Sequence, residues 1–494
     1  MCKEQQYIEE SEFSKPRRLH PAAMIFNLIR VIKETILGLG IGLIFTFKEA
    51  SIYYVFIFVS IFAGFLIISS ILSWLRFTYR VENNELRIEQ GIFIRKKRFI
   101  SINRIHKIDL TANIFHRLFQ LVQVQIDTAS SGGGAEVSLS AVKVAEAERL
   151  RKTLKKRQTT QTESEEQLEK VYPRKKITWG RLFIAGTTSG SVGIILAAIL
   201  AGFTQIEELI PQNIYNSTFT WIINQGVILL IGLGIFMLLL LWLFGIAGTM
   251  IKYGNFTIEK RENELFIKRG LLETKELTIP FDRIQAIGIE QSLIRQPLKL
   301  VRVFAVVAGG SFDKMEPFPV LIPIIHEKEV EPFLQQFIPE YSELETDFVP
   351  LSKRGRKFYL LNASLLFVLL FFPVAYFIPT FSWIPLILII GSLGFGWLQH
   401  KDGGYAIHGK KITLRKRGLG KVTIMTYHRR IQSLEKKQHK IQALQQLATT
   451  EVSLIGSGGL GTHYKLKHLE EEDANKIADW YSYRKPNDLL EQSE

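Results

Sequence analysis

The feature that most constrains this chain is a set of long, uncharged, apolar stretches. Residues 358–399 contain no charged side chain, and residues 51–75 form a second such stretch between Ala50 and Arg76. An α-helix rises about 1.5 Å per residue, so either stretch exceeds the hydrocarbon thickness of a bilayer, about 30 Å. The chain is therefore expected to cross a membrane.

Six membrane helices, arranged as three hairpins, are expected. Four spans are predicted at residues 22–47, 51–75, 182–206 and 221–251. Residues 358–399 are too long for one span and contain several prolines, so they are expected to form two helices with a turn near Pro379 and Thr380. A short loop joins the two helices of each pair, and the chain therefore returns to the same side after every hairpin.

Lysine and arginine indicate which side of the membrane holds the polar blocks. Span ends that face these blocks carry Arg76, Arg181, Lys252 and Arg356, among other cations, whereas the short hairpin loops carry only Lys48. Cytoplasmic flanks are enriched in these residues. A multi-pass protein of the cell membrane is predicted, with both termini and all three polar blocks in the cytoplasm.

These boundaries divide the chain into ten segments. They are an N-terminal tail (1–20), hairpin 1 (21–75), a first domain (76–156), a polar linker (157–178), hairpin 2 (179–251), a second domain (252–339), a linker (340–356), hairpin 3 (357–399), a third domain (400–485) and a tail (486–494).

The three polar blocks are copies of one unit. Each copy has a glycine after its second strand, an Arg-Ile pair after its third, and a leucine sixteen residues beyond that isoleucine. The repeat-defining residues, expected to be structural, are Gly91, Arg104, Ile105 and Leu121 in the first copy, Gly270, Arg283, Ile284 and Leu300 in the second, and Gly418, Arg430, Ile431 and Leu447 in the third. Short strands closed by one helix predict a small bent sheet or partly open barrel, giving an α+β membrane protein.

This unit resembles the bacterial pleckstrin-homology-like (PH-like) multi-pass membrane proteins. The resemblance covers residues 21–483 and rests on the Arg-Ile pair, on the segment Arg117-Leu118-Phe119-Gln120-Leu121 and on an apolar strand that runs into a glycine-rich turn. Gln120 stands where the family usually has glycine, and the second and third copies lack the arginine of this segment. A ligand contact at Arg117 is therefore not carried over to those two copies.

The resemblance implies several properties beyond the residues themselves. It implies a PH-like sheet capped by a C-terminal helix, no established enzyme activity, and a smaller membrane partner that carries the same domain. It also implies a part in envelope maintenance or in tolerance of membrane-active peptides.

Basic runs are the candidate contacts for anionic lipid or a partner protein. They are Arg95-Lys96-Lys97-Arg98, Lys268-Arg269 and Arg415-Lys416-Arg417. The net charge of +15 also favours anionic partners, and each cation near an anionic leaflet contributes roughly 1 kcal/mol. The competing interpretation of each run is a solvated strand face. Nucleic acid is not expected, because aromatic residues are not interleaved with these charges.

The recurring arginine of the Arg-Ile pair has two interpretations. A guanidinium can satisfy several backbone carbonyls in a turn, or it can bind an anion. The sequence leaves both open.

No catalytic, metal or cofactor site is expected. The chain lacks a phosphate-binding loop, a zinc-protease helix motif and a serine nucleophile elbow. Its single cysteine, Cys2, excludes an internal disulfide and a multi-cysteine metal site. The leading hypothesis is a non-catalytic membrane scaffold, and the alternative is a transporter or lipid-handling permease formed by the hairpins. The sequence does not determine the oligomeric state.

Overall fold

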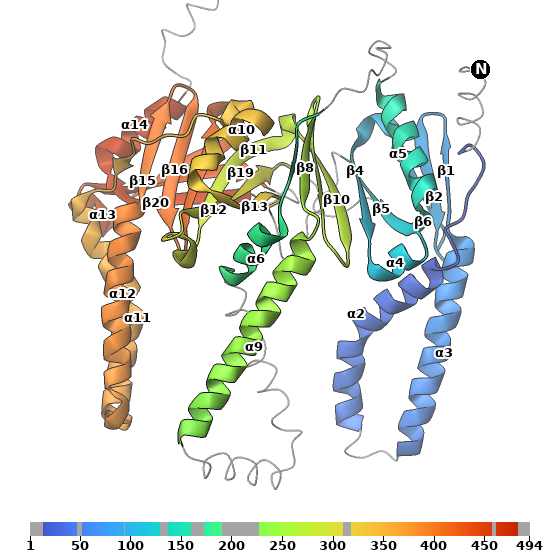
Figure 1. Cartoon of the computed structure of the whole chain (residues 1–494), viewed down its shortest axis with the longest axis horizontal. Helices are drawn as coiled ribbons and strands as arrows, with labels where there is room; N and C mark the ends of the chain where they lie inside the picture. The colour runs from blue at the N-terminus through green and yellow to red at the C-terminus, as the bar shows by residue number, and fades with distance from the viewer. Residues whose placement is uncertain are drawn as a thin grey trace, which may run out of the picture. The chain divides into compact units, whose positions relative to one another are not determined.

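A computed structural model describes residues 13–46, 52–92, 94–128, 137–159, 172–189, 227–309, 318–456 and 461–482. The chain forms two compact units. The first comprises residues 1–172 with 266–278, and the second comprises residues 173–265 with 279–494. Antiparallel strands and long apolar helices make up both units (Figure 1).

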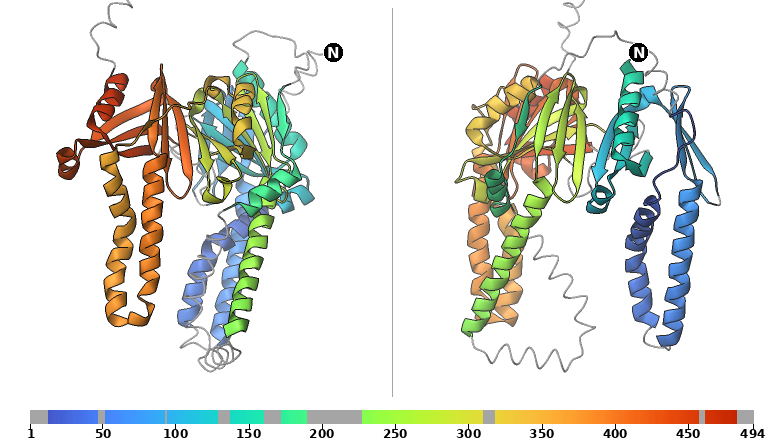
Figure 2. Two further views of the ribbon diagram at one scale, coloured as in Figure 1. Left: turned by 60° about the vertical axis from the view of Figure 1, so that its left-hand side comes forward. Right: turned by 45° about the vertical axis from the view of Figure 1, so that its right-hand side comes forward.

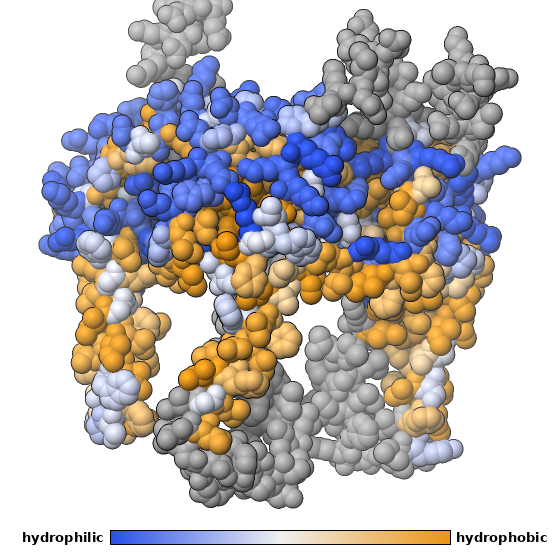
Figure 3. Space-filling view, in the orientation of Figure 1, coloured by the Kyte–Doolittle hydropathy of each residue, from blue (hydrophilic) through white to orange (hydrophobic). Residues whose placement is uncertain are grey.

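The apolar helices lie within or overlap the stretches that the sequence predicts as membrane spans. The first unit contains α2 (Ala23–Thr46) and α3 (Ile52–Arg76), and the second contains α6 (Trp179–Thr187), α9 (Val227–Tyr253), α11 (Arg356–Phe377) and α12 (Trp383–Asp402). The helices α11 and α12 lie side by side in both further views (Figure 2). Hydrophobic side chains cover the exposed surfaces of α3, α9, α11 and α12, while hydrophilic residues predominate over the strands (Figure 3).

Four of the described helices are long and apolar enough to cross a membrane. They are Phe56–Arg76, Gly232–Tyr253, Lys353–Phe377 and Pro379–Asp402. Their apolar side chains are largely exposed, which suits a lipid environment. In α2, Ala23–Ile32 is a shorter apolar helix, and the span predicted at 182–206 runs beyond residue 189, outside the described residues. The third hairpin turns at Pro379–Phe381, where the sequence predicts it.

Each repeat contains six strands and a closing helix. The first repeat has β1 (Thr78–Glu82), β2 (Glu85–Gln90), β3 (Lys96–Ser101), β4 (Ile105–Ala112), β5 (Leu121–Thr128), β6 (Val137–Lys143) and α5 (Val144–Thr159). The second has β8 (Thr257–Arg261), β9 (Glu264–Arg269), β10 (Thr274–Pro280), β11 (Ile284–Gln291), β12 (Leu300–Val307), β13 (Val320–His326) and α10 (Val330–Phe337). The third has β15 (Gly404–His408), β16 (Lys411–Arg417), β17 (Lys421–Tyr427), β18 (Ile431–Lys437), β19 (Leu447–Ile455), β20 (Gly461–Glu470) and α14 (Glu471–Tyr481).

The six strands of every repeat fall into two groups of three that belong to different sheets, where the sequence predicts a small bent sheet or partly open barrel. In the first repeat β1, β2 and β3 form one sheet, whereas β4, β5 and β6 belong to another. A one-turn 3₁₀-helix separates the two halves of every repeat, at Ile102–Arg104, Phe281–Arg283 and His428–Arg430. The turn redirects the chain, so the fourth strand leaves the third and becomes available to other partners.

The segment ahead of each hairpin adds a short extended piece to the first strand of the repeat. Arg17 bridges to Tyr79 in β1, β7 (Arg174–Lys176) pairs with β8, and β14 (Val349–Pro350) pairs with β15. The chain therefore pairs with the first strand of a repeat before it enters a hairpin, and forms that repeat after it leaves the hairpin.

Alternating burial along the strands builds the cores. Along β1 and β2 every second residue is buried, as expected for strands with one face on a core. The closing helix α5 adds Ala147, Leu150 and Leu154, which lie on one helical face and are fully buried.

Candidate interaction surfaces

The first junction between repeats is a strand pair in the first unit. There β10, from the second repeat, pairs antiparallel with β4 of the first. Thr274 lies opposite Ala112, Lys275 opposite Thr111, and Glu276 opposite Leu110. The first residue of β10 thus faces the last residue of β4.

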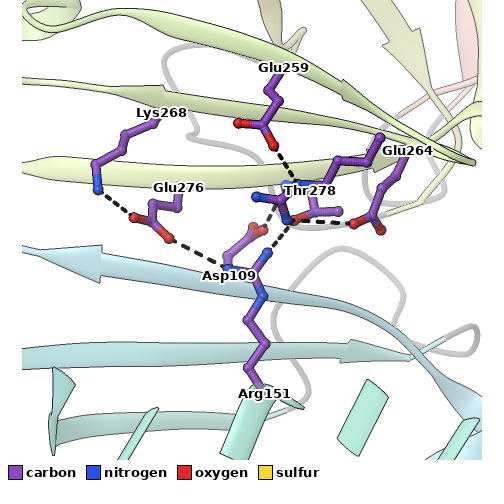
Figure 4. A network of polar contacts seen from close by, with 8 residues as sticks. Asp109, Arg151, Glu259, Glu264, Lys268, Glu276 and Thr278 are labelled. Atoms are coloured by element: carbon purple, nitrogen blue, oxygen red, sulfur yellow. Dashed lines mark hydrogen bonds and ion pairs between the residues drawn. The ribbon is translucent and has the colours of Figure 1, made fainter. Parts of the chain in front are cut away.

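A polar network fixes this junction (Figure 4). Arg151 of α5 donates from Nη2 to Thr278 Oγ1 at 3.1 Å, and its Nη1 lies 3.5 Å from Glu276 Oε2. Lys268 Nζ lies 2.7 Å from the other oxygen of Glu276, and the buried Asp109 accepts from the backbone N–H of Thr278 at 3.4 Å. Helix α5 and strand β4 of the first repeat are thereby joined to strands β9 and β10 of the second.

The second junction lies in the second unit and repeats the geometry of the first. There β17, from the third repeat, pairs antiparallel with β11 of the second, from Lys421 opposite Gln291 to Thr426 opposite Ala286. Again the first residue of the third strand faces the last residue of the fourth. Two junctions with the same register show that edge-to-edge pairing is a property of the repeat.

The three basic runs lie in different environments. The first run spans the turn before β3 and β3 itself, whereas the second lies on β9 and the third on β16, which are second strands of their repeats. Lys96 and Lys97 are exposed, and Arg95 pairs with Glu89 at 2.6 Å. The structure therefore does not place the three runs at one common position of the repeat.

Residues of the second and third runs mainly make contacts with other residues of the protein. Lys268 belongs to the network at the first junction, and Arg269 beside it is half-buried. Arg415 donates to the Asp402 carbonyl at 2.9 Å, and Arg417 is buried in an ion pair with the Asp402 carboxylate. Burial also lowers the pKa of Lys416, which lies over the Tyr464 ring.

The repeat-defining residues occupy turns and strand starts. Ile105, Ile284 and Ile431 are buried at the start of the fourth strand, and Leu121, Leu300 and Leu447 begin the fifth. The residue before each of these leucines has a positive φ: Gln120 (52°), Lys299 (51°) and Gln446 (54°). Glycine adopts this conformation most easily, which accounts for the family's usual glycine at the position of Gln120.

The third glycine of the repeat lies in a different conformation from the first two. Gly91 and Gly270 have φ values of 111° and 107°, and a Cβ atom there would overlap a backbone carbonyl. Gly418 lacks a positive φ, and a Cβ atom there would meet open space. Gly91 and Gly270 lie thirteen residues before Arg104 and Arg283, and the residue thirteen before Arg430 is Arg417, the last residue of β16. Arg417, not Gly418, therefore stands at the equivalent position.

The recurring arginine ends the 3₁₀-turn of every repeat. Arg104 is exposed, whereas Arg430 donates to the backbone carbonyl of Asp282 in the 3₁₀-turn of the second repeat. The Arg283 carbonyl accepts from the Ala308 N–H at 2.9 Å. At Arg430 the side chain thus reaches a backbone carbonyl across the second junction.

A surface that the sequence analysis did not single out lies between the fourth and fifth strands. We define this surface as the tip, residues 114–119, 293–298 and 440–445, which contain α4 (Ile114–Leu118), η4 (Leu293–Arg295) and α13 (Lys440–Leu444). Apolar side chains that are more than half exposed occur on every tip: Phe115 and Leu118, Ile294 and Leu298, Ile441 and Leu444. Apolar residues within an otherwise polar block are the signal that could have revealed it.

Each tip also has a buried polar residue at the same position, which connects it to its surroundings. His116 stacks on Phe26 of α2, with ring centroids 3.8 Å apart, and its Nε2 lies 2.8 Å from the Ser140 carbonyl. Arg295 donates to the carbonyls of Ala185 (3.2 Å) and Pro323 (3.3 Å). In the first two repeats the tip is thereby joined to the first helix of the preceding hairpin.

In the third repeat two side chains share this role. Gln442 donates from Nε2 to Thr449 Oγ1 and lies 3.0 Å from His468 Nδ1. His468 in turn stacks on Phe358 of α11, with ring centroids 4.8 Å apart. Figure 1 shows α13 beside the ends of α11 and α12 that lie nearest the strands. Among the residues that the structure describes, no group of three metal-ligating side chains occurs.

Comparisons with known proteins match the repeat. A family model described as the bacterial PH domain (bPH_2) matches residues 31–158, 192–338 and 365–485. The UPF0699 transmembrane protein YdbT of Bacillus subtilis (strain 168) is 35% identical over 493 residues, which cover 96% of this chain and 99% of that protein. The three matches confirm the PH-like repeats and the family resemblance inferred from the sequence.

Proposed function

Because the chain belongs to the bacterial PH domain family and is a multi-pass membrane protein, we propose that it is a non-catalytic scaffold of the plasma membrane. Its three PH-like domains lie in the cytoplasm, are anchored by the hairpins, and contact the anionic leaflet and partner proteins. Envelope maintenance is the role that the family resemblance favours.

The observation that carries this proposal is the tip. All three repeats present exposed apolar side chains, and packing or hydrogen bonds join each tip to the hairpin helix or to the strands beside it. Exposed apolar surface that is held next to a membrane helix is suited to the interfacial region of the bilayer. The tips would then hold the domains flat against the leaflet.

The expected energy of this contact is sufficient for a tethered domain. Burying a large apolar side chain fully contributes about 1.5–3 kcal/mol, so a half-exposed residue of the tip contributes about 1 kcal/mol on entering lipid. Arg117 and Lys440 are exposed cations on the first and third tips, and the exposed Lys299 directly follows the second tip; each is worth roughly 1 kcal/mol near anionic lipid. The hairpin already keeps the domain at the surface, so no further cost of capture from solution arises.

The junctions support a scaffold role for the domains. Edge-to-edge pairing of β4 with β10 and of β11 with β17 makes sheets that extend beyond one repeat. A permease formed by the hairpins is not favoured: in the described groove between α11 and α12 the polar residues are the uncharged Asn362, Ser392 and Gln399.

The proposal is tested by measuring the depth of the tips. In a chain with Cys2→Ser, single cysteines replace Phe115, Ile294 or Leu444 and carry an environment-sensitive fluorophore. The protein is placed in nanodiscs that contain phosphatidylglycerol and lipids with a spin label near the headgroup. Strong quenching at all three tips is the expected result.

The matched controls are cysteines at Glu262 and Lys410. Both lie in the turn between the first two strands, and the first strand leads away from the membrane helix that precedes it. Quenching at the tips no greater than at these turns would overturn the proposal.

A further inference from the structure

We infer that the outer edge of β3 is a docking site for the fourth strand of a PH-like domain in a separate, membrane-anchored protein, and that this strand carries acidic residues. The inference deepens the proposed scaffold role, since it identifies the partner surface. It concerns a different surface from the tips, so either proposal can fail without the other.

The third strand of a repeat pairs with the fourth strand of the preceding repeat wherever the chain supplies a preceding repeat. Its two counterparts, β10 and β17, each pair with a fourth strand in the same register. Within the described residues, β3 has only β2 as a neighbouring strand, and it ends the sheet β1-β2-β3. The outer edge of β3 is therefore equivalent to two strand edges that are paired within the chain.

The exposure of one residue in the third strand shows which side chain a strand paired with β3 would cover. Phe99, Thr278 and Met425 are each the third residue before the 3₁₀-turn of their repeat. Thr278 and Met425 are 9% and 1% exposed at the junctions, whereas Phe99 is 57% exposed. An exposed aromatic residue on an open strand edge is costly in water and is stabilised by a strand partner.

The chain's own N-terminal segment does not fill this edge. The Val81 N–H donates to the Phe13 carbonyl at 2.8 Å, and the Arg17 N–H donates to the Tyr79 carbonyl at 2.9 Å. Residues 13–17 therefore run along β1, on the opposite side of the sheet from β3.

A second copy of the chain is a poor occupant because its charges oppose. The register of the two junctions places the residue equivalent to Lys96 opposite Thr111 in one and Glu290 in the other. In the third repeat the corresponding residues are Lys437 and Lys436 on β18, which ends its sheet within the described residues. The carboxylates beside them are already engaged, since Lys437 pairs with Glu435 and Glu451 at 2.7 Å and Lys436 pairs with Glu471 at 3.0 Å. Copy-to-copy pairing would set Lys96 against Lys437 and Lys97 against Lys436, and like charges directly opposite are destabilising.

The fitting occupant is therefore a fourth strand with Asp or Glu at these two positions. Only the short strands β1 and β2 separate β3 from the membrane helix α3. A strand that pairs with β3 must therefore lie as close to the bilayer as β3 does. A membrane-anchored PH-like domain meets this requirement, and confinement to the bilayer raises its effective concentration. The lysines also keep unrelated strands from pairing with the edge.

The test uses the full chain in its native membrane. Phe99 is replaced by the photo-cross-linker p-benzoylphenylalanine, cells are irradiated, and the cross-linked peptides are identified by mass spectrometry. The expected product joins residue 99 to the fourth strand of a PH-like domain in another membrane protein. The substitutions Lys96→Glu and Lys97→Glu should lower its yield about tenfold, because two attractive pairs become repulsive.

Two further variants make the outcome decisive. The same cross-linker at Phe115, on the tip, should not yield this product. In a chain with Cys2→Ser, Lys96→Glu and Lys97→Glu, the edge becomes complementary to β18, so Phe99→Cys should form an intermolecular disulfide with Leu434→Cys of a second copy. Products that join residue 99 only to lipid, to another copy of the wild-type chain or to a different part of a partner would overturn the inference, as would an unchanged yield in the charge variant.

Discussion

Buried polar side chains at one position of the repeat join tips to hairpins. Arg295 illustrates the arrangement best, because it is almost fully buried and its guanidinium reaches three acceptors: the Ala185 and Pro323 carbonyls and Thr188 Oγ1. Burial lowers the pKa of this arginine, and the acceptors offset part of the cost of keeping its charge. Such a residue stabilises the joint only while all its partners remain in place.

Replacing Arg295 with methionine should therefore be strongly destabilising. Three acceptors would lose their donor, and we expect the free energy of unfolding to fall by about 2–4 kcal/mol. Denaturant titration of the purified chain in detergent micelles measures this change. Arg356→Met is the control, since Arg356 is exposed and its loss should change stability by less than about 0.5 kcal/mol.

His468 should make the stability of the third repeat depend on pH. Burial, with a smaller contribution from Lys467, lowers the pKa of His468 to about 4, below its usual value near 6.5. Between these values the unfolded chain binds more protons than the folded chain. The stabilising contribution is therefore complete above pH 6.5 and decreases as the pH falls towards 4.

The expected loss between pH 7 and pH 4.5 is about 1–2 kcal/mol, after allowance for the partial exposure of this side chain. His468→Asn is the test variant, since asparagine tolerates the positive φ of 57° at this position. The difference in unfolding free energy between wild type and variant should shrink at the lower pH. A difference that stays constant with pH would contradict the assignment.

At the scale of elements, the strand junctions depend on side-chain contacts as well as on the backbone hydrogen bonds between the strands. Glu276 sits between Arg151 and Lys268 at the first junction and is largely buried. Since β10 and β4 come from different repeats, this ion pair links elements that local sequence does not connect. Partly buried pairs of this kind contribute more than exposed ones.

Reversing the charge of Glu276 should therefore open the first junction. In Glu276→Lys, three cations meet, and backbone amides of β10 and of the end of β4 should exchange hydrogen about tenfold faster. Hydrogen-exchange mass spectrometry measures this rate. Glu273→Lys is the matched control because Glu273 is about half exposed. Equal exchange in the two variants would show that the network does not hold the junction.

At the scale of the whole molecule, the predicted hairpins would place all three domains on the same side of the membrane. The hairpin α11–α12 has its turn at Pro379–Phe381, and the domain after it begins with β15. Thr380, in the turn of this hairpin, and Lys410, in the turn between β15 and β16, are expected to lie on opposite sides of the membrane.

Cysteine labelling of intact cells checks the predicted orientation. In a chain with Cys2→Ser, Thr380→Cys should react with a membrane-impermeant maleimide, whereas Lys410→Cys should react only after lysis. Each residue serves as the control for the other. Labelling of Lys410→Cys in intact cells would show that the orientation is opposite to the predicted one.

Hydropathy and repetition by themselves determined the membrane spans of α3, α9, α11 and α12, the three-fold repeat and the family, because these properties depend on local composition and spacing. They also marked Ile105, Ile284 and Ile431 as residues that define the repeat, and the structure places these isoleucines, buried, at the start of the fourth strands.

Only the tertiary structure decided which strand edges meet and which charges are buried. Pairing of β4 with β10, or burial of Arg417 against Asp402, depends on segments that are distant in sequence, and a basic run carries no local sign of such a partner. Edge pairing is made by backbone groups that every residue possesses, so its register becomes specific only when folded domains bring the strands together.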